Sequence, residues 1–144
     1  MKKNILGKIV AHVHTIEVQK RGLPHMHLLL WFEDGSKIRT PAEVDSLISA
    51  EFPNPDTHPR LYKLVSELMI HSPCGAEKPN APCMKDGSCS KHFPKGFCEF
   101  TSVNGEGYPT YRRRDDHREH EVRGHKFDNC HVVPYCPALL LIME

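Results

Sequence analysis

Residues 16–32 have the sequence IEVQKRGLPHMHLLLWF, and this stretch decides the fold prediction. β-branched and large apolar residues stand on both sides of KRGLP (20–24), where a Gly and a Pro predict a turn. The first strand is expected over residues 8–19 and the second over 25–32. Two strands joined by so short a turn predict an antiparallel β-hairpin.

The second predicted strand opens with two histidines, His25 and His27. Residues two apart on a strand point to the same face, and a turn centred on Arg21 would place Glu17 directly across from His25. Two imidazoles and one carboxylate can hold a divalent cation and leave open positions for a phosphate. Gln19 shares the parity of Glu17 and is a further candidate ligand. The alternative is that both histidines are surface residues on the polar face of a half-exposed strand.

Helices and a second hairpin are predicted after this stretch. Thr40, Pro41 and Glu43 form a capping-box pattern that predicts the start of an amphipathic helix. Apolar residues at helical spacing predict a second helix over residues 59–71, namely Leu61, Leu64, Val65 and Leu68. NGEG (104–107) predicts a hairpin turn.

The segment 72–96 is rich in Pro, Gly, Cys and Lys and has almost no apolar periodicity. It can bury little of itself, so a tether is needed to order it. The N-terminus lacks a signal-peptide cleavage pattern, which favours metal binding over disulfides for the six cysteines. The preferred ligands of a structural zinc ion are His71, Cys74, Cys83 and Cys89. His92 and Cys98 compete for the fourth position, and reduced cysteines in a loop are the alternative.

The charge distribution offers one local basic stretch. The formal net charge is +1, so the overall charge does not indicate nucleic-acid binding. Three arginines follow Tyr108 and Tyr111, a combination that suits single-stranded nucleic acid. A solvated face is the alternative, because two aspartates follow. The candidate DNA contacts are Lys20, Arg21, Arg112, Arg113 and Arg114. No run approaches the ~18 apolar residues of a membrane helix, so no membrane partner is expected.

The stretch IEVQKRGLPHMHLLLWF resembles the metal-binding motif of the HUH endonucleases, specifically the replication-initiator (Rep) domain of Helitron rolling-circle transposons. Further segments of that domain follow in the same order: HSPCGAEKPNAPCMKDGSCSKHFPK (71–95), GYPTYRRRDD (107–116) and VRGHKFDNCHVVPYCPALLL (122–141). The resemblance extends over nearly the whole chain from Gly7.

This resemblance implies an α+β fold with a ferredoxin-like antiparallel (HUH) sheet, the histidine pair on a central strand, and flanking helices. It implies Mg²⁺ or Mn²⁺ held by His25, His27 and Glu17, acting on the scissile phosphate of single-stranded DNA. The family's nucleophile is a tyrosine that leaves a 5′-phosphotyrosine link and a free 3′-OH. A eukaryotic transposon protein would act in the nucleus.

None of the four tyrosines, Tyr62, Tyr108, Tyr111 and Tyr135, matches the family's nucleophile. The sequence therefore predicts no catalytic residue, and the chain is expected to be an incomplete Rep domain that forms no covalent DNA adduct alone. Cys136 stands where the family has Asn, and His131 where an aromatic residue is usual. The expected parts of the single domain 1–144 are a metal-binding hairpin with helices (7–70), a Cys/His-rich insert (71–100) and a C-terminal hairpin with a truncated end (101–144).

Two other hypotheses remain open beside the Rep fragment. One is a non-catalytic DNA-binding module that keeps its metal and DNA contacts. The other is a small zinc-stabilised interaction domain unconnected to DNA.

Overall fold

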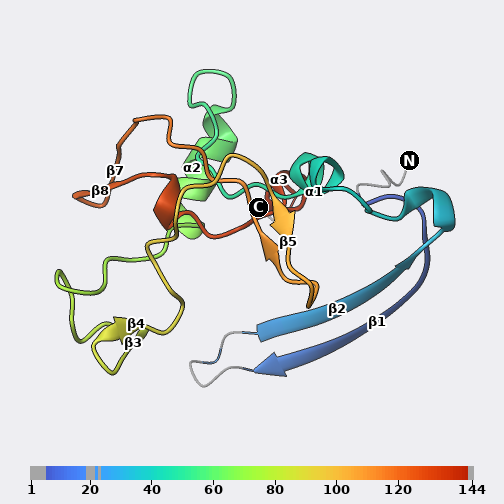
Figure 1. Ribbon diagram of the computed structural model, residues 1–144, viewed down its shortest axis with the longest axis horizontal. Coiled ribbons are helices and arrows are strands. Elements are labelled where there is room, and N and C mark those ends of the chain that lie inside the picture. The colour runs from blue at the N-terminus through green and yellow to red at the C-terminus, as the bar shows by residue number, and fades with distance from the viewer. Residues whose placement is uncertain (1–5, 19–21, 23, 143–144) are drawn as a thin grey trace. The chain divides into compact units, whose positions relative to one another are not determined.

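The computed structural model describes residues 6–18, 22 and 24–142 (Figure 1). The chain divides into two compact units, Met1–Arg39 and Thr40–Glu144. The strands of the described residues form four two-stranded antiparallel sheets, and helices occur beside them. The prediction of a mixed fold of helices and antiparallel strands is confirmed at this level, whereas a single ferredoxin-like sheet stays a prediction.

The first unit is built on the predicted hairpin. Strands β1 (Ile9–Val18) and β2 (Pro24–Phe32) pair antiparallel, with Glu17 opposite His25. A 3₁₀ turn, η1 (Asp34–Ser36), follows, and an ion pair of 2.8 Å joins Lys8 to Glu33 across the open end of the hairpin.

The second unit holds the predicted helices. Helix α1 (Pro41–Leu47) begins with the capping box: the Thr40 hydroxyl accepts from the Glu43 N–H at 3.2 Å, and the Glu43 carboxylate accepts from the Thr40 N–H at 2.9 Å. Helix α2 (Pro59–Leu68) buries three of its four predicted core residues. The fourth, Leu68, is 63% exposed because the helix ends there.

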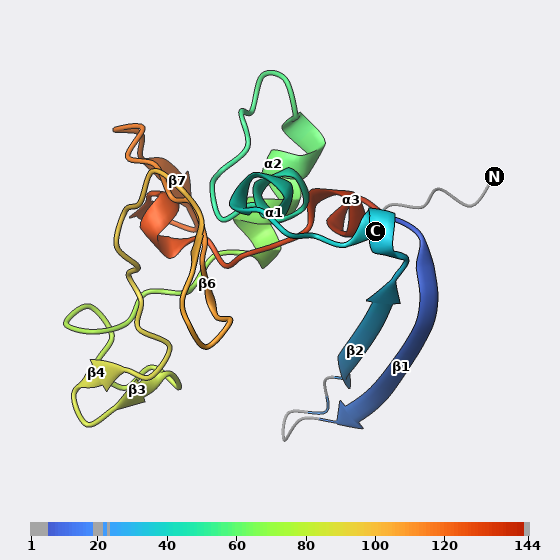
Figure 2. The ribbon, with the colours of Figure 1, turned by 45° about the vertical axis from the view of Figure 1, so that its right-hand side comes forward.

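The core of this unit packs α2 against the C-terminal segment. Its buried cluster comprises Leu61, Val65, Val132 and Tyr135. Isolated bridges pair Ile70 with Val132 and Ser49 with Tyr135, and these bridges hold the segment that follows η2 (Asn129–His131). The short helix α3 (Pro137–Leu140) then lies close to α2 (Figure 2). None of the helices in the described ranges has the length and apolar content that crossing a membrane requires.

Three short hairpins complete the second unit. The pair β5 (Ser102–Val103) and β6 (Pro109–Thr110) confirms the hairpin predicted at NGEG. Sequence reasoning missed the other two, which are β3 (Met84–Lys85) with β4 (Ser88–Cys89) and β7 (His120–Val122) with β8 (His125–Phe127).

Candidate functional site

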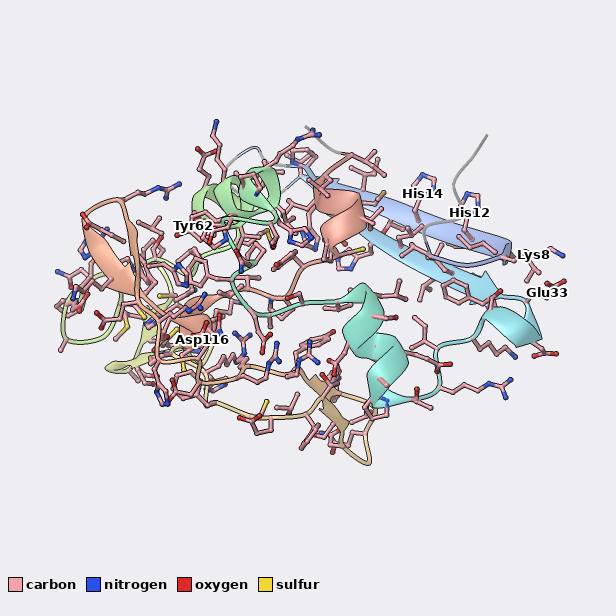
Figure 3. The ribbon with its side chains drawn as sticks, turned by 90° about the horizontal axis from the view of Figure 1, so that it is seen from above. Lys8, His12, His14, Glu33, Tyr62 and Asp116 are labelled. Atoms are coloured by element: carbon pink, nitrogen blue, oxygen red, sulfur yellow. The ribbon has the colours of Figure 1, made fainter. Side chains whose placement is uncertain are left out.

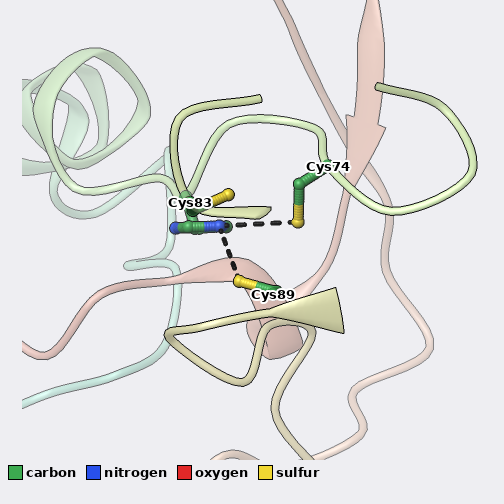
Figure 4. Close-up of side chains that lie close together, drawn as sticks. Cys74, Cys83 and Cys89 are labelled. Carbon is green, nitrogen blue, oxygen red and sulfur yellow. Dashed lines mark hydrogen bonds between the residues drawn. The ribbon is translucent and has the colours of Figure 1, made fainter. Parts of the chain in front are cut away.

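Four side chains of the Cys/His-rich insert converge on one point, and they are the predicted set: His71, Cys74, Cys83 and Cys89. Their ligand atoms all lie within 4.8 Å of one another. His71 Nε2 is 3.6 Å from Cys74 Sγ and 3.5 Å from Cys89 Sγ (Figure 4). We refer to these four residues as the Cys/His cluster.

Two nitrogen–sulfur distances within the Cys/His cluster fit a tetrahedral zinc ion. Zn–S bonds of about 2.3 Å and Zn–N bonds of about 2.0–2.1 Å at tetrahedral angles separate nitrogen from sulfur by roughly 3.6 Å. The two N···S distances, 3.6 and 3.5 Å, agree with that value. Four protein ligands leave no open position, which is typical of structural and not of catalytic zinc.

His71 is held in place from two sides. Its backbone N–H donates to the carbonyl of His131 at 2.9 Å, next to the bridge that pairs Ile70 with Val132. Its ring stacks on Phe93, with centroids 4.2 Å apart and an interplanar angle of 8°. The imidazole therefore faces the cysteines in a fixed orientation.

The β3–β4 hairpin brings Cys83 and Cys89 together. Its turn residues, Asp86 and Gly87, have φ of 50° and 78°, as a two-residue type I′ turn requires. Beyond the paired residues, the N–H of Ser90 donates to the carbonyl of Cys83 at 2.8 Å. Two cysteines that are six positions apart in the sequence thus come to lie side by side.

The pKa values in the Cys/His cluster shift as its packing dictates. Burial, with hydrogen bonds to the thiols of Cys89 and Cys83, raises the pKa of Cys74 to about 12. The backbone N–H of Phe93 lowers the pKa of Cys89 against the effect of burial. Burial, with the charges of His131 and Lys95, lowers the pKa of His71, which favours the neutral imidazole that a metal requires.

The two competing ligands do not join the Cys/His cluster. His92 is exposed, and Cys98 Sγ donates instead to the carbonyl of Tyr111 at 2.9 Å. All six cysteines are free thiols. No other described residues bring three or more such ligand atoms this close together.

The hairpin histidines and their predicted carboxylate form a second, looser group, which we call the hairpin trio: Glu17, His25 and His27. His27 Nε2 lies 3.7 Å from Glu17 Oε2, and the two imidazole rings meet edge to face with centroids 4.7 Å apart. The Glu17 and His27 side chains are 67% and 60% exposed, so the face is open to a ligand. Gln19, Lys20 and Arg21 lie outside the described residues.

Comparison with known proteins bears on this same stretch. Residues 1–30 match the family model described as the Helitron helicase-like domain at the N-terminus. The Helitron resemblance is confirmed over these residues, which include the whole hairpin trio. No curated protein matches the chain.

The Helitron-like segment carries a second histidine pair that sequence reasoning passed over, although the motif AHVH shows it. His12 and His14 stack with ring centroids 6.1 Å apart (Figure 3). They lie on the face of the hairpin opposite to the trio, because their positions have the other parity. Their cross-strand partners are Leu30 and Leu28, so neither faces a carboxylate on the other strand.

The basic stretch outside the Helitron-like segment behaves differently from the surface patch that its sequence suggested. Arg113 is only 4% exposed and donates to the carbonyls of Val132 at 2.6 Å and Asn129 at 2.7 Å. Burial lowers the pKa of its guanidinium, and the nearby Cys130, Cys98 and Glu51 oppose that shift. Arg113 therefore braces the core, and DNA contact by Arg113 stays a prediction.

The neighbouring arginines bind carboxylates. Arg114 holds Glu51 through two side-chain hydrogen bonds of 3.0 and 2.7 Å, and Arg112 Nη1 lies 3.6 Å from an Asp45 oxygen. Burial of Glu51 favours a raised pKa, but the hydrogen bonds and charge of Arg114 outweigh it and the pKa is lowered. DNA contact by Arg112 and Arg114 stays a prediction.

Proposed function

We propose that this chain is a DNA-handling part of a Helitron-type Rep protein, in which the hairpin trio holds Mg²⁺ or Mn²⁺ against the backbone of single-stranded DNA. One observation carries the proposal: Glu17, His25 and His27 share one exposed face of β1–β2, inside the Helitron-like residues 1–30. In the intact protein, the family resemblance adds nicking and joining through a phosphotyrosine on a ferredoxin-like sheet, in the nucleus.

The residues of the trio suit this task. Two neutral imidazoles and one carboxylate give a net charge of −1, so a bound divalent cation keeps a positive charge for a phosphate. Glu17 is 3.7 Å from His27 and can orient its ring as well as share the cation. When bound, a divalent cation supplies charge neutralisation and polarises a phosphoryl oxygen.

The proposal gives this chain a role in cation and DNA binding without strand cleavage, and two of its four tyrosines have hydroxyls that are already engaged. The Tyr135 hydroxyl is buried and donates to the carbonyl of Glu51 at 3.0 Å, and burial raises its pKa. The Tyr62 hydroxyl lies 3.0 Å from His120 Nδ1. Both hydroxyls are thus engaged within the second unit. The proposal assigns no catalytic residue.

A second candidate is a non-catalytic, zinc-stabilised module that binds DNA or a protein without using the hairpin. The Cys/His cluster favours it, because this cluster is assembled more tightly than the trio. The two candidates differ in one measurable property, which is whether the hairpin binds a hard divalent cation.

The test is a Mn²⁺ titration of the zinc-loaded chain, followed through the electron paramagnetic resonance signal of free Mn²⁺. Prior zinc loading keeps Mn²⁺ out of the Cys/His cluster. We expect saturable binding that is lost in His25→Ala/His27→Ala. The matched control is His12→Ala/His14→Ala, which removes two histidines from the opposite face of the same hairpin and should bind normally. Equal binding by both double variants would reject the trio as the site.

A further inference from the structure

A groove of about 690 Å³ opens on the second unit, between the chain at residues 91–98 and the chain at 109–113. Its volume falls within the about 300–1,000 Å³ typical of ligand sites. Val133 and Pro134 also line it. The groove contains neither the hairpin trio nor any residue of the Helitron-like match.

The groove is positively charged although the whole chain is nearly neutral. Lys91 and Lys95 line it, and none of the described residues around it carries a carboxylate. The Lys95 backbone N–H donates to the carbonyl of Cys130 at 2.9 Å, and its Nζ lies 5.2 Å from the centre of the Phe93 ring. An anionic ligand therefore meets the two lysines, with the buried Arg113 behind them, and no carboxylate.

Aromatic side chains supply the other half of the lining. Phe93 already stacks on His71, whereas Phe97 is 44% exposed and Tyr111 is half-buried. These two belong to segments joined by the bridge between Cys98 and Arg113, with backbone hydrogen bonds of 2.9 Å in both directions. The thiol of Cys98 adds a hydrogen bond to the Tyr111 carbonyl. The aromatic pair is thus carried on braced backbone.

We propose that this groove binds single-stranded DNA, with bases stacked on Phe97 and Tyr111 and phosphates at Lys91 and Lys95. Aromatic platforms beside cations are how sequence-tolerant single-strand binders work, because every base has a π-face and every nucleotide a phosphate. A duplex hides those faces in its own stack. The inference rests on the proposed function for its choice of ligand, but it assigns a contact that needs no divalent cation.

The experiment measures binding of the full zinc-loaded chain to a labelled oligothymidylate by fluorescence anisotropy, without Mg²⁺ or Mn²⁺. Stacking is worth about 1–3 kcal/mol per base, so Phe97→Ala should weaken binding about five-fold or more. Phe97→Leu keeps an apolar side chain but has no ring and should show a comparable loss. The matched control is Phe100→Ala, since Phe100 is 80% exposed and does not line the groove.

The cations are tested through salt dependence. Each phosphate contact to a single strand contributes about 0.7 to the slope of log K against log salt, so Lys91→Glu/Lys95→Glu should lower that slope by about 1.4 or more. Lys63→Glu/Lys85→Glu changes the net charge equally away from the groove and should lower it less. Matching zinc contents and unfolding midpoints would show that each variant is folded.

Equal affinities of the Phe97 and Phe100 variants would overturn the inference, as would equal affinity of the groove for duplex and single strand. If the wild type binds the oligonucleotide only with Mn²⁺, and only His25→Ala/His27→Ala abolishes binding, the proposed function stands and the groove inference fails. If the wild type binds no single-stranded DNA with or without Mn²⁺, both fail.

Discussion

Replacement of Arg113 by Ala offers the sharpest test of how the second unit is held together. This guanidinium donates to the carbonyls of Val132 at 2.6 Å, Asn129 at 2.7 Å and Ala50 at 3.3 Å. These carbonyls come from two distant segments, and Arg113 joins both to its own segment. The variant would leave the acceptors in place and remove their shared donor.

The expected loss follows from the acceptors. A buried carbonyl left without a donor costs about 1–3 kcal/mol, and the two short hydrogen bonds therefore give roughly 2–6 kcal/mol. Removal of a buried cation relieves its desolvation and offsets a part, so we expect a net loss of roughly 3 kcal/mol in the free energy of unfolding. That is a large fraction of the about 5–15 kcal/mol that stabilises a typical domain.

Urea denaturation of the zinc-loaded chain measures this loss. The single tryptophan, Trp31, lies in the hairpin unit, so the helix signal in far-ultraviolet circular dichroism is the better probe of the second unit. With a slope of about 1.5 kcal/mol per molar urea, the midpoint should fall by about 2 M. Arg118→Ala, at an exposed position, should change stability by less than about 0.5 kcal/mol. If the two variants are equally stable, Arg113 is not the brace that its contacts indicate.

Two further predictions concern the cluster and Glu51. Protein purified without chelator should contain one zinc ion per chain by metal analysis. Cys83→Ser should lose this zinc, and Cys136→Ser should keep it. A zinc content near zero in the wild type would reject the zinc site. Because Arg114 holds the folded-state pKa of Glu51 below its usual 4.5, ionised Glu51 stabilises the fold above that pH, and this is lost as the pH falls through the folded-state pKa. At pH 7 the free energy of unfolding of the wild type should exceed that of Glu51→Gln by about 1 kcal/mol, a figure that allows for solvent screening at the exposed Arg114. A difference of the same size in acid would contradict this prediction.

The elements that the sequence predicts best are those with local signals. The capping box at Thr40 and the turn at NGEG appear where predicted, because each depends on a few adjacent residues. The Asp86-Gly87 turn carries an equally local signal, because an Asp-Gly pair is typical of a two-residue hairpin turn, although it was not predicted. The turn at Arg123-Gly124, with φ of 53° and 76°, has a weaker signal, since arginine seldom adopts a left-handed conformation.

The features that the sequence does not predict depend on contacts between residues far apart in the chain. The charge run 112–114 predicts a surface in any sequence, and nothing in it distinguishes Arg113 from its neighbours. The distinction comes from the isolated bridge between Arg113 and Cys98. At this bridge the Arg113 side chain is buried and donates to the carbonyls of Asn129 and Val132. The Cys/His cluster was predictable for the opposite reason, because ligand chemistry limits which residues can be partners whatever their separation in the sequence.

The exposed apolar residues of the hairpin bear on its place in a larger sheet. Val13 and Leu29 lie exposed on the face of the trio, and Ile16 and Met26 on the other face. A lone two-stranded sheet is marginally stable in water, and a strand pair that is apolar on both faces is typical of the interior of a covered sheet. This pattern supports the proposal that β1 and β2 are central strands of a ferredoxin-like sheet.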